Sequence, residues 1–210
     1  MPARVTKVVT SGTFALDGGE WDVDNNVWLV GDDDEVLVVD AAHDGAAILD
    51  AVGDRRVVAV VLTHGHNDHI NAAVEVAAAK DAEIALHSDD SMLWAAEYGE
   101  DLAPDIRLAD GSSFEVAGTR LVLRHTPGHS PGAVSLYAAD LGVVFTGDTL
   151  FQGGPGATGR SYSDFPTIVE SIRRSLLTLP AETVVHTGHG ADTTIGAEAP
   201  HLDEWLARGH

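Results

Sequence analysis

A run of histidine and aspartate directly after an apolar strand constrains this sequence most strongly. Residues 57–70 read VVAVVLTHGHNDHI, which fits the pattern H-x-H-x-D-H. In extended backbone, side chains two residues apart project to the same side, so His64 and His66 can bind one metal ion. Asp68 and His69 follow the turn into a helix, so they point elsewhere and can serve a second ion. A helix cap alone would need one such residue, whereas this stretch has four.

Three further candidate ligands lie in tight turns that follow predicted strands. His129 lies in HTPGHSPG, Asp148 in TGDTLF and His189 in TGHG. Loops at strand ends are where the sites of layered α/β folds gather. Neutral imidazoles and carboxylates suit zinc or a similar first-row cation, and the absence of cysteine excludes every thiolate-ligated site. A single histidine in a turn is usually only solvated, but the joint fit of these motifs predicts metal binding.

The hydrophobic pattern predicts the order of the remaining elements. We expect strands at residues 4–10, 26–30, 35–39, 57–62, 83–86, 119–124, 133–137, 142–145 and 183–186, and helices at residues 44–52, 69–80, 89–98, 163–179 and 197–207. No linker, repeat or low-complexity tract interrupts them, so a single domain over residues 1–210 is expected. Two mixed sheets with helices on both outer faces account for this order, although alternation alone does not exclude a three-layer α/β fold.

These four motifs, in this order, resemble the metallo-β-lactamase superfamily, and most closely its glyoxalase II-like hydrolases, from about residue 25 to residue 198. The resemblance implies a four-layer αββα sandwich of two mixed β-sheets flanked by helices. It implies a first metal held by His64, His66 and His129, a second held by Asp68, His69 and His189, and Asp148 as a bridge between them. It also implies that Asp40, at the end of a predicted strand, supports the histidine loop from behind.

The sequence departs from the glyoxalase II pattern on the substrate side. Residues 70–73 read INAA where two glycines usually follow the last histidine, and Ser161-Tyr162-Ser163 lengthens a Gly-Arg-Asp-Phe-Pro element that borders the expected mouth of the site. Arg160 and Tyr162 are therefore candidate substrate residues, and His43 is a candidate pocket residue beside Asp40. In larger glyoxalase II enzymes a C-terminal helical domain holds glutathione, whereas we expect one helix after Glu198 and a weaker grip on that thiol.

These residues predict a hydrolase with two divalent metal ions, zinc in the first place and iron or manganese as alternatives. Two ions would hold a bridging water, lower its pKa and stabilise the developing oxyanion, while Asp68 orients the nucleophile and Asp148 bridges. The expected substrate is a thioester or ester of a small molecule, such as an S-acyl conjugate of a low-molecular-weight thiol. A lactonase is an alternative, and a β-lactam is a weaker one. A persulfide dioxygenase with one iron on His64, His129 and Asp148 stays open. A binding protein with a decayed site is disfavoured, because no ligand position is substituted.

The net charge of the chain restricts the kinds of partner that it can bind. Twelve Lys and Arg stand against 33 Asp and Glu, which gives a net charge of −21. Such a surface repels phosphate backbones and anionic membranes, so we expect neither nucleic acid nor membrane as a partner. With no signal-like segment near the N-terminus, the expected location is the cytoplasm.

Overall fold

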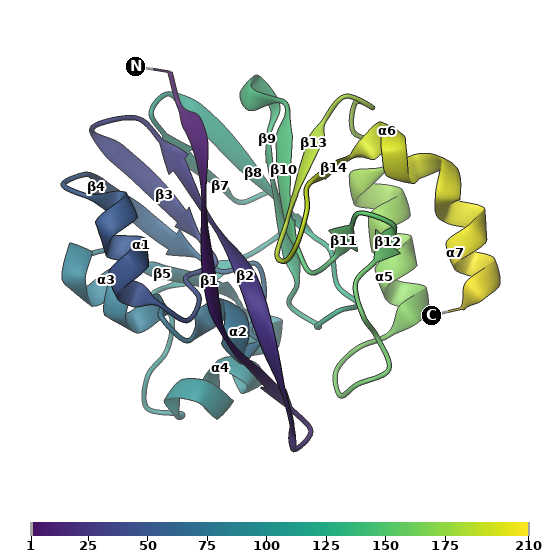
Figure 1. Cartoon of the computed structure of the whole chain (residues 1–210), viewed down its shortest axis with the longest axis horizontal. Helices are drawn as coiled ribbons and strands as arrows, with labels where there is room; N and C mark the ends of the chain where they lie inside the picture. The colour runs from purple at the N-terminus through teal and green to yellow at the C-terminus, as the bar shows by residue number, and fades with distance from the viewer. Residues whose placement is uncertain (1, 210) are drawn as a thin grey trace.

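The first half of the chain forms one six-stranded sheet, the N-terminal sheet (Figure 1). In the computed structural model, which describes residues 2–209, its strands are β1 (Arg4–Leu16), β2 (Gly19–Gly31), β3 (Glu35–Val39), β4 (Arg56–Val61), β5 (Ile84–His87) and β6 (Ile106–Leu108), in that spatial order. The first three strands run antiparallel, and β3 to β6 run parallel. Parallel neighbours need crossover connections, which here contain α1 (Gly45–Val52), α2 (Asn67–Ile70), α3 (Ala73–Lys80) and α4 (Ser91–Tyr98).

The second half forms the C-terminal sheet, in the order β14 (Thr193–Thr194), β13 (Val184–Thr187), β10 (Val143–Gly147), β9 (Val134–Ala138), β8 (Thr119–His125) and β7 (Ser113–Val116). Only β10 and β13 run parallel. The chain between them forms β11 (Leu150–Phe151), β12 (Gly154–Pro155) and α5 (Phe165–Ser171), which continues as a π-helical turn, Ile172–Leu176. The short α6 (Ile195–Glu198) and α7 (Leu202–Arg208) follow β14.

Three apolar clusters separate the four layers. Leu37 and Val39 of β3 face the C-terminal sheet, where they pack with Leu123 and Phe145. Val36 and Val38 alternate with them and face the helices on the outer side. A third cluster lies between the C-terminal sheet and the helices α5 and α7. From Val36 to Val39, β3 is buried on both faces and its sequence is continuously apolar. The predicted αββα sandwich of two mixed sheets is confirmed.

The hairpin of β1 and β2 is longer than the sequence predicts. Both strands have 13 residues and pair from Arg4 with Gly31 to Leu16 with Gly19. The strands were expected only at residues 4–10 and 26–30, because the far half of the hairpin, residues 11–16 and 19–24, has only exposed or half-buried residues. The strands β6 and β7 are also additional to the prediction, since each is short and mostly unburied.

The single helix expected at residues 69–80 is wrong. The structure has α2 and α3 with a break at Asn71 and Ala72. The Ala72 amide donates to Ala41 O at 3.1 Å, and Asn71 Oδ1 accepts from the His43 amide at 2.6 Å. Tertiary hydrogen bonds to the loop after β3 therefore replace the helical bond at the break. None of the helices in residues 2–209 combines the length and hydropathy needed to cross a membrane.

Candidate metal centre

The predicted ligands lie in loops at the carboxyl ends of strands from both sheets. His64 and His66 follow β4, and Asp68 and His69 lie on α2. The other three lie in loops of the C-terminal sheet: His129 between β8 and β9, Asp148 after β10 and His189 after β13. The structure brings all seven side chains together. Their potential ligand atoms form two separate groups of three, which a third group of His64, His69 and Asp148 joins.

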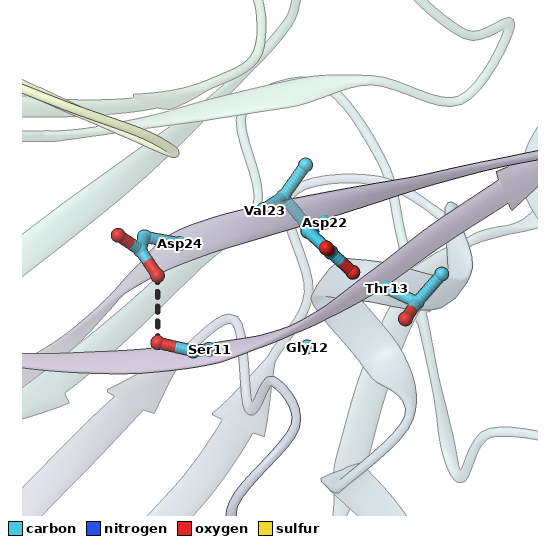
Figure 2. Close-up of a pocket in the computed structure, with 6 residues that line it drawn as sticks. All are labelled: Ser11, Gly12, Thr13, Asp22, Val23 and Asp24. Carbon is cyan, nitrogen blue, oxygen red and sulfur yellow. Dashed lines mark hydrogen bonds between the residues drawn. The ribbon is translucent and has the colours of Figure 1, made fainter.

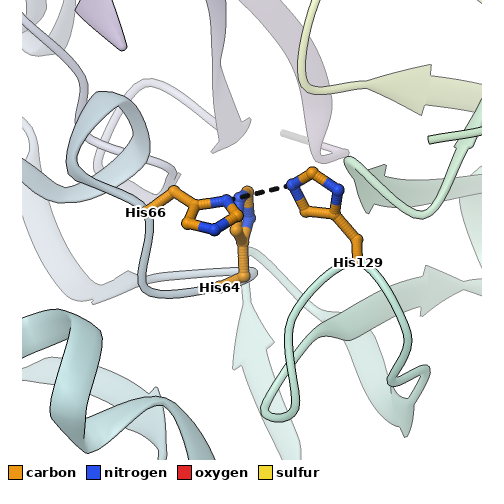
Figure 3. A group of neighbouring side chains, drawn as sticks. All are labelled: His64, His66 and His129. Carbon is orange, nitrogen blue, oxygen red and sulfur yellow. Dashed lines mark hydrogen bonds between the residues drawn. The ribbon is translucent and has the colours of Figure 1, made fainter. Parts of the chain in front are cut away.

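The first group contains only histidines. Potential ligand atoms of His64, His66 and His129 all lie within 4.8 Å of one another, and the three side chains are buried. Figure 3 shows the three rings converging, with His66 Nδ1 at 3.0 Å from His129 Nε2. His129 Nδ1 donates to Ala157 O at 2.9 Å, so the lone pair of that ring is on Nε2, which faces His66. Three neutral imidazoles in this arrangement are a ligand set that zinc accepts.

The second group contains Asp68, His69 and His189. His69 Nδ1 faces Asp40 Oδ2 at 3.1 Å, and His189 Nδ1 faces Asp24 O at 2.7 Å. Since both partners only accept hydrogen bonds, both Nδ1 atoms carry a hydrogen, which leaves the two Nε2 atoms as the positions that can take a cation or a second proton. Those two Nε2 atoms lie 3.2 Å apart, and each is within 3.6 Å of Asp68 Oδ2. Such a convergence of acceptors needs a cation or a proton between them.

Asp148 lies where the two groups meet. Its carboxylate oxygens are 3.3 Å from His69 Nε2 and 3.4 Å from His189 Nε2 in the second group. They are also 3.5 Å from His129 Nε2 in the first group. One carboxylate that reaches ligands of both groups is placed to bridge two cations.

Buried atoms without hydrogen-bond partners test whether these residues fit a metal. Within residues 2–209, six buried side-chain N or O atoms have no hydrogen-bond partner, and four belong to predicted ligands. These four are His64 Nε2, His66 Nε2, Asp68 Oδ1 and Asp148 Oδ1. A buried polar atom left unpaired is costly, so its concentration at one place calls for a partner that the protein itself does not supply. The residues present fit divalent cations.

The electrostatics of the two groups differ. Burial lowers the pKa of His66 to about 3 and the pKa of His64 well below its usual value, so these two imidazoles are neutral. Burial also opposes charge on His189, but the carboxylates of Asp148 and Asp68 outweigh it and raise its pKa to about 10. Burial alone would raise the pKa of Asp148. The neighbouring His189 and His69 outweigh burial and hold this pKa well below its ordinary range. The second group therefore attracts positive charge, and binding of a metal there releases a proton.

Asp40 holds the histidine loop from behind, as the resemblance implies. Its carboxylate accepts from the Thr63 amide and the Thr63 hydroxyl, both at 2.7 Å, and from His69. Thr63 Oγ1 in turn lies 3.2 Å from His64 Nδ1. Asp40 has φ 59°, a left-handed conformation that is costly outside glycine and that persists where surrounding contacts enforce it. Asp40 thereby orients one histidine of each group.

A polar chain behind the second group was not predicted from the sequence. Asn25 is fully buried, and its Nδ2 lies 3.2 Å from both Asp68 Oδ2 and His69 Nε2. Asn25 Oδ1 faces His43 Nε2 at 2.9 Å, and His43 Nδ1 faces the Asn71 amide at 3.1 Å. His43 therefore contacts the centre only through Asn25. Nothing in the sequence distinguishes Asn25 from an ordinary strand residue, because its role depends on a crossing between β2 and α2.

Two glycines allow the loops of the two sheets to approach. A Cβ on Gly147, where φ is 48°, would lie 2.2 Å from Thr63 Oγ1. A Cβ on Gly188 would lie 2.2 Å from Asp148 Oδ1 and 2.8 Å from His69 Cε1. Neither position leaves room for a side chain, which explains the glycine in TGD and in TGHG.

The far end of the β1–β2 hairpin and the 157–164 loop meet beside the first group. The Arg160 guanidinium lies 3.7 Å from the centre of the Trp21 ring, and the Ser161 amide donates to Asp17 Oδ2 at 3.1 Å. Phe14 extends this contact to the centre, since its ring is 5.3 Å from the His66 ring. Tyr162 is about half exposed at the rim, without a direct contact to a ligand among the described residues.

Two other features are not part of the centre. A depression of about 430 Å³ on the hairpin is lined by Ser11, Gly12, Thr13, Asp22, Val23 and Asp24, and Figure 2 shows Ser11 bonded to Asp24 across it. None of the predicted ligands lines it. His87, Asp89 and His125 also cluster, but the rings of His87 and His125 stack at 10° and 4.3 Å. An ion must lie near the plane of each ligating ring, and two stacked rings cannot share one.

Comparisons with known proteins agree with this geometry. The family model for the metallo-beta-lactamase superfamily matches residues 21–189. The chain is 34% identical over 187 residues to the probable metallo-hydrolase YqgX of Bacillus subtilis, covering 82% of this chain and 88% of that protein. It is 31% identical over 188 residues to the hydroxyacylglutathione hydrolase GloC of Haemophilus influenzae, covering 82% and 89%. The solved structure of TTHA1623 in a di-iron-bound form matches with a TM-score of 0.73 and 30% identity, over 90% of this chain and 96% of that one.

Proposed function

The chain belongs to the metallo-β-lactamase superfamily, and from that premise we propose that it is a dinuclear metal-dependent thioesterase. Its substrate would be an S-acyl conjugate of a low-molecular-weight thiol in the cytoplasm. His64, His66 and His129 would hold one cation, Asp68, His69 and His189 the other, with Asp148 between them. Zinc suits these nitrogen and oxygen donors, as do iron and manganese.

The observation that carries the proposal is the convergence of potential ligand atoms in two adjacent groups. His69 Nε2 and His189 Nε2 face each other at 3.2 Å beside two carboxylates, and three further histidines converge next to them. One cation could not satisfy both groups. Asp148, which contacts members of both, is the natural bridge.

When bound, two such cations supply a water of lowered pKa and stabilise negative charge on the carbonyl oxygen. Asp68 is placed to orient that water. Its Oδ2 is held by Asn25 at 3.2 Å, while its buried Oδ1 has no hydrogen-bond partner among the described residues. A free carboxylate oxygen beside the reacting water can accept its hydrogen bond and fix its direction.

The rim of the centre favours a substrate whose leaving thiol compound carries a negatively charged group. A thiol has a pKa of about 8.5, so it leaves without strong help from a general acid. Arg160 is the cation of the rim, and Trp21 holds its guanidinium in place. It is therefore placed to bind a carboxylate of the thiol part. The likeness to the hydroxyacylglutathione hydrolase GloC supports this substrate class.

The test is to purify the protein without chelator and to quantify zinc, iron and manganese per chain. The same preparation is assayed with matched acyl groups on glutathione, coenzyme A and mycothiol, with lactones, and with a persulfide while oxygen uptake is recorded. We expect two metal equivalents and the highest kcat/KM on a thioester. His201→Ala, an exposed histidine outside the centre, serves as the matched control for His→Ala variants of the ligands.

Other outcomes would identify another function. One iron per chain with persulfide-dependent oxygen uptake would replace this proposal by a dioxygenase. Faster turnover of lactones than of any thioester would make the protein a lactonase. A chain that binds no metal and turns over nothing would be a binding protein.

A further inference from the structure

Asp90 is a fully buried carboxylate outside the set of candidate ligands. It ends the 3-10 turn Ser88–Asp90 that follows β5. Its Oδ2 accepts from the Gly65 amide at 2.8 Å and from the Ser130 hydroxyl at 2.6 Å, and its Oδ1 accepts from the Gly132 amide at 2.6 Å. No Lys or Arg of residues 2–209 pairs with it.

These three donors come from two different ligand loops. Gly65 lies between the ligands His64 and His66, in the loop after β4 of the N-terminal sheet. Ser130 and Gly132 follow His129, in the loop between β8 and β9 of the C-terminal sheet. Asp90 is thus bonded to both loops that supply the three histidines of the first group. Its carboxylate therefore links these two loops through hydrogen bonds.

The two loops pack closely against Asp90. A Cβ on Gly65 would lie 3.0 Å from Asp90 Cβ, and a Cβ on Gly132 would lie 2.8 Å from Asp90 Cγ. Both loops therefore approach the carboxylate with bare backbone. A buried charge is expensive to desolvate even when hydrogen-bonded, so stability alone is a poor reason for a carboxylate at this position.

We propose that Asp90 is a positioning residue that fixes the separation of His64 and His66 from His129 and so sets the affinity of the first cation. The proposal rests on the metal centre of the proposed function. Three ligands bind one ion tightly only if their spacing is fixed before the ion arrives, and loss of groups that orient ligands typically weakens metal binding about 10- to 100-fold.

The experiment is a competition titration of the apo protein with Zn²⁺ and a chromophoric chelator, which gives one constant for each cation. His66→Ala and His69→Ala identify which constant belongs to the first and which to the second group. In Asp90→Asn an NH2 group replaces one of the two carboxylate oxygens. This NH2 group then faces either the Gly132 amide or the Gly65 amide and Ser130 hydroxyl, and it cannot accept their hydrogen bonds. We expect the first constant to weaken about 10-fold or more and the second to stay within about twofold.

Two further variants protect the test against a general loss of stability. Ser130→Ala removes a single bond to Asp90 and should weaken the same constant to a smaller degree, even if Asp90→Asn does not fold. Glu198→Gln is the matched control, because Glu198 is a buried carboxylate that bonds Thr193 and Gly153 away from the first group. It should lower the melting temperature without changing the first constant.

The outcomes separate this proposal from the function. A wild-type protein that does not bind two cations overturns the dinuclear function. A wild-type protein that binds two, with unchanged constants in Ser130→Ala and Asp90→Asn, overturns the role of Asp90 alone. Equal weakening of both constants, or the same change in Glu198→Gln, would also overturn it, since the effect would then be general.

Discussion

Asp148 is the residue on which the coupling of the two groups depends, because its carboxylate reaches histidines of both. Asp148→Asn keeps the shape of the side chain but replaces one carboxylate oxygen by an NH2 group. Only one oxygen is then left to bind a cation. We expect turnover to fall more than about 100-fold, while the melting temperature of the metal-free protein changes little. Activity and thermal midpoint measured on the same preparation check this. Normal turnover in the variant would exclude Asp148 as a bridge.

Each group of ligands should account for one metal ion, and one histidine from each group tests this. We expect His66→Ala and His69→Ala each to lose about one metal equivalent and most activity, because a missing protein ligand is only partly replaced by water. Elemental analysis after gel filtration measures the loss. His201→Ala, on the surface, should keep the wild-type metal content, and a ligand variant that also keeps it would contradict the assignment of that ligand.

The sequence predicted candidate ligands from local motifs, and it carried no signal for residues that reach the centre only through the tertiary fold. His64, His66, Asp68 and His69 stand in one motif whose spacing alone predicts two directions. Asn25 and Asp90 carry no such signal. Asn25 gains its role because β2 crosses α2, and Asp90 because the turn after β5 lies under two loops from different sheets.

Among the elements, the β1–β2 hairpin contacts the 157–164 loop, which is far from it in the sequence, and we expect the two to act together on the substrate. Trp21 on the hairpin holds Arg160 of the 157–164 loop, a contact of the kind that contributes about 0.5–1 kcal/mol at exposed sites. We expect Trp21→Ala and Arg160→Ala each to raise KM for an anionic thioester several-fold with a smaller effect on kcat. The double variant should be no worse than Arg160→Ala, because Trp21 acts through Arg160.

Steady-state kinetics of the four proteins form the test, with Trp21→Phe as the control that keeps an aromatic ring under the guanidinium. Independent, multiplicative effects of the two substitutions would show that Trp21 and Arg160 act separately. An uncharged substrate of the same size should be insensitive to Arg160→Ala. If it is equally affected, Arg160 shapes the loop instead of binding an anion.

Elements with a buried face were predictable, and exposed ones were not. β3 and β4 are apolar because both faces are covered, and they were found with nearly correct bounds. The far half of the hairpin has no such pattern, since pairing between its own two strands maintains it. The break between α2 and α3 escaped prediction because it is set by hydrogen bonds to the loop after β3.

At the scale of the whole molecule, the net charge of −21 opposes compactness. Repulsion among like charges is screened by salt, with a Debye length of about 30 Å at 0.01 M and about 10 Å at 0.1 M. We therefore expect the melting temperature to rise with NaCl over this range, by about 2–4 °C for each kcal/mol of relieved repulsion. Calorimetry on the metal-free protein measures it, with sucrose as an uncharged control. A midpoint that falls with NaCl would contradict this expectation.

Each sheet is drawn from one continuous half of the chain, the N-terminal one from residues 4–108 and the C-terminal one from residues 113–194. Each half can therefore condense from contacts that are relatively near in sequence, and as the polypeptide leaves the ribosome the first half can do so before the second exists. The ligands, in contrast, come from both halves, so a cation can engage its full set only after the halves have docked. Zinc should then leave the refolding rate unchanged and slow unfolding, which makes the bound ion a kinetic latch on a finished fold and not a nucleus for it.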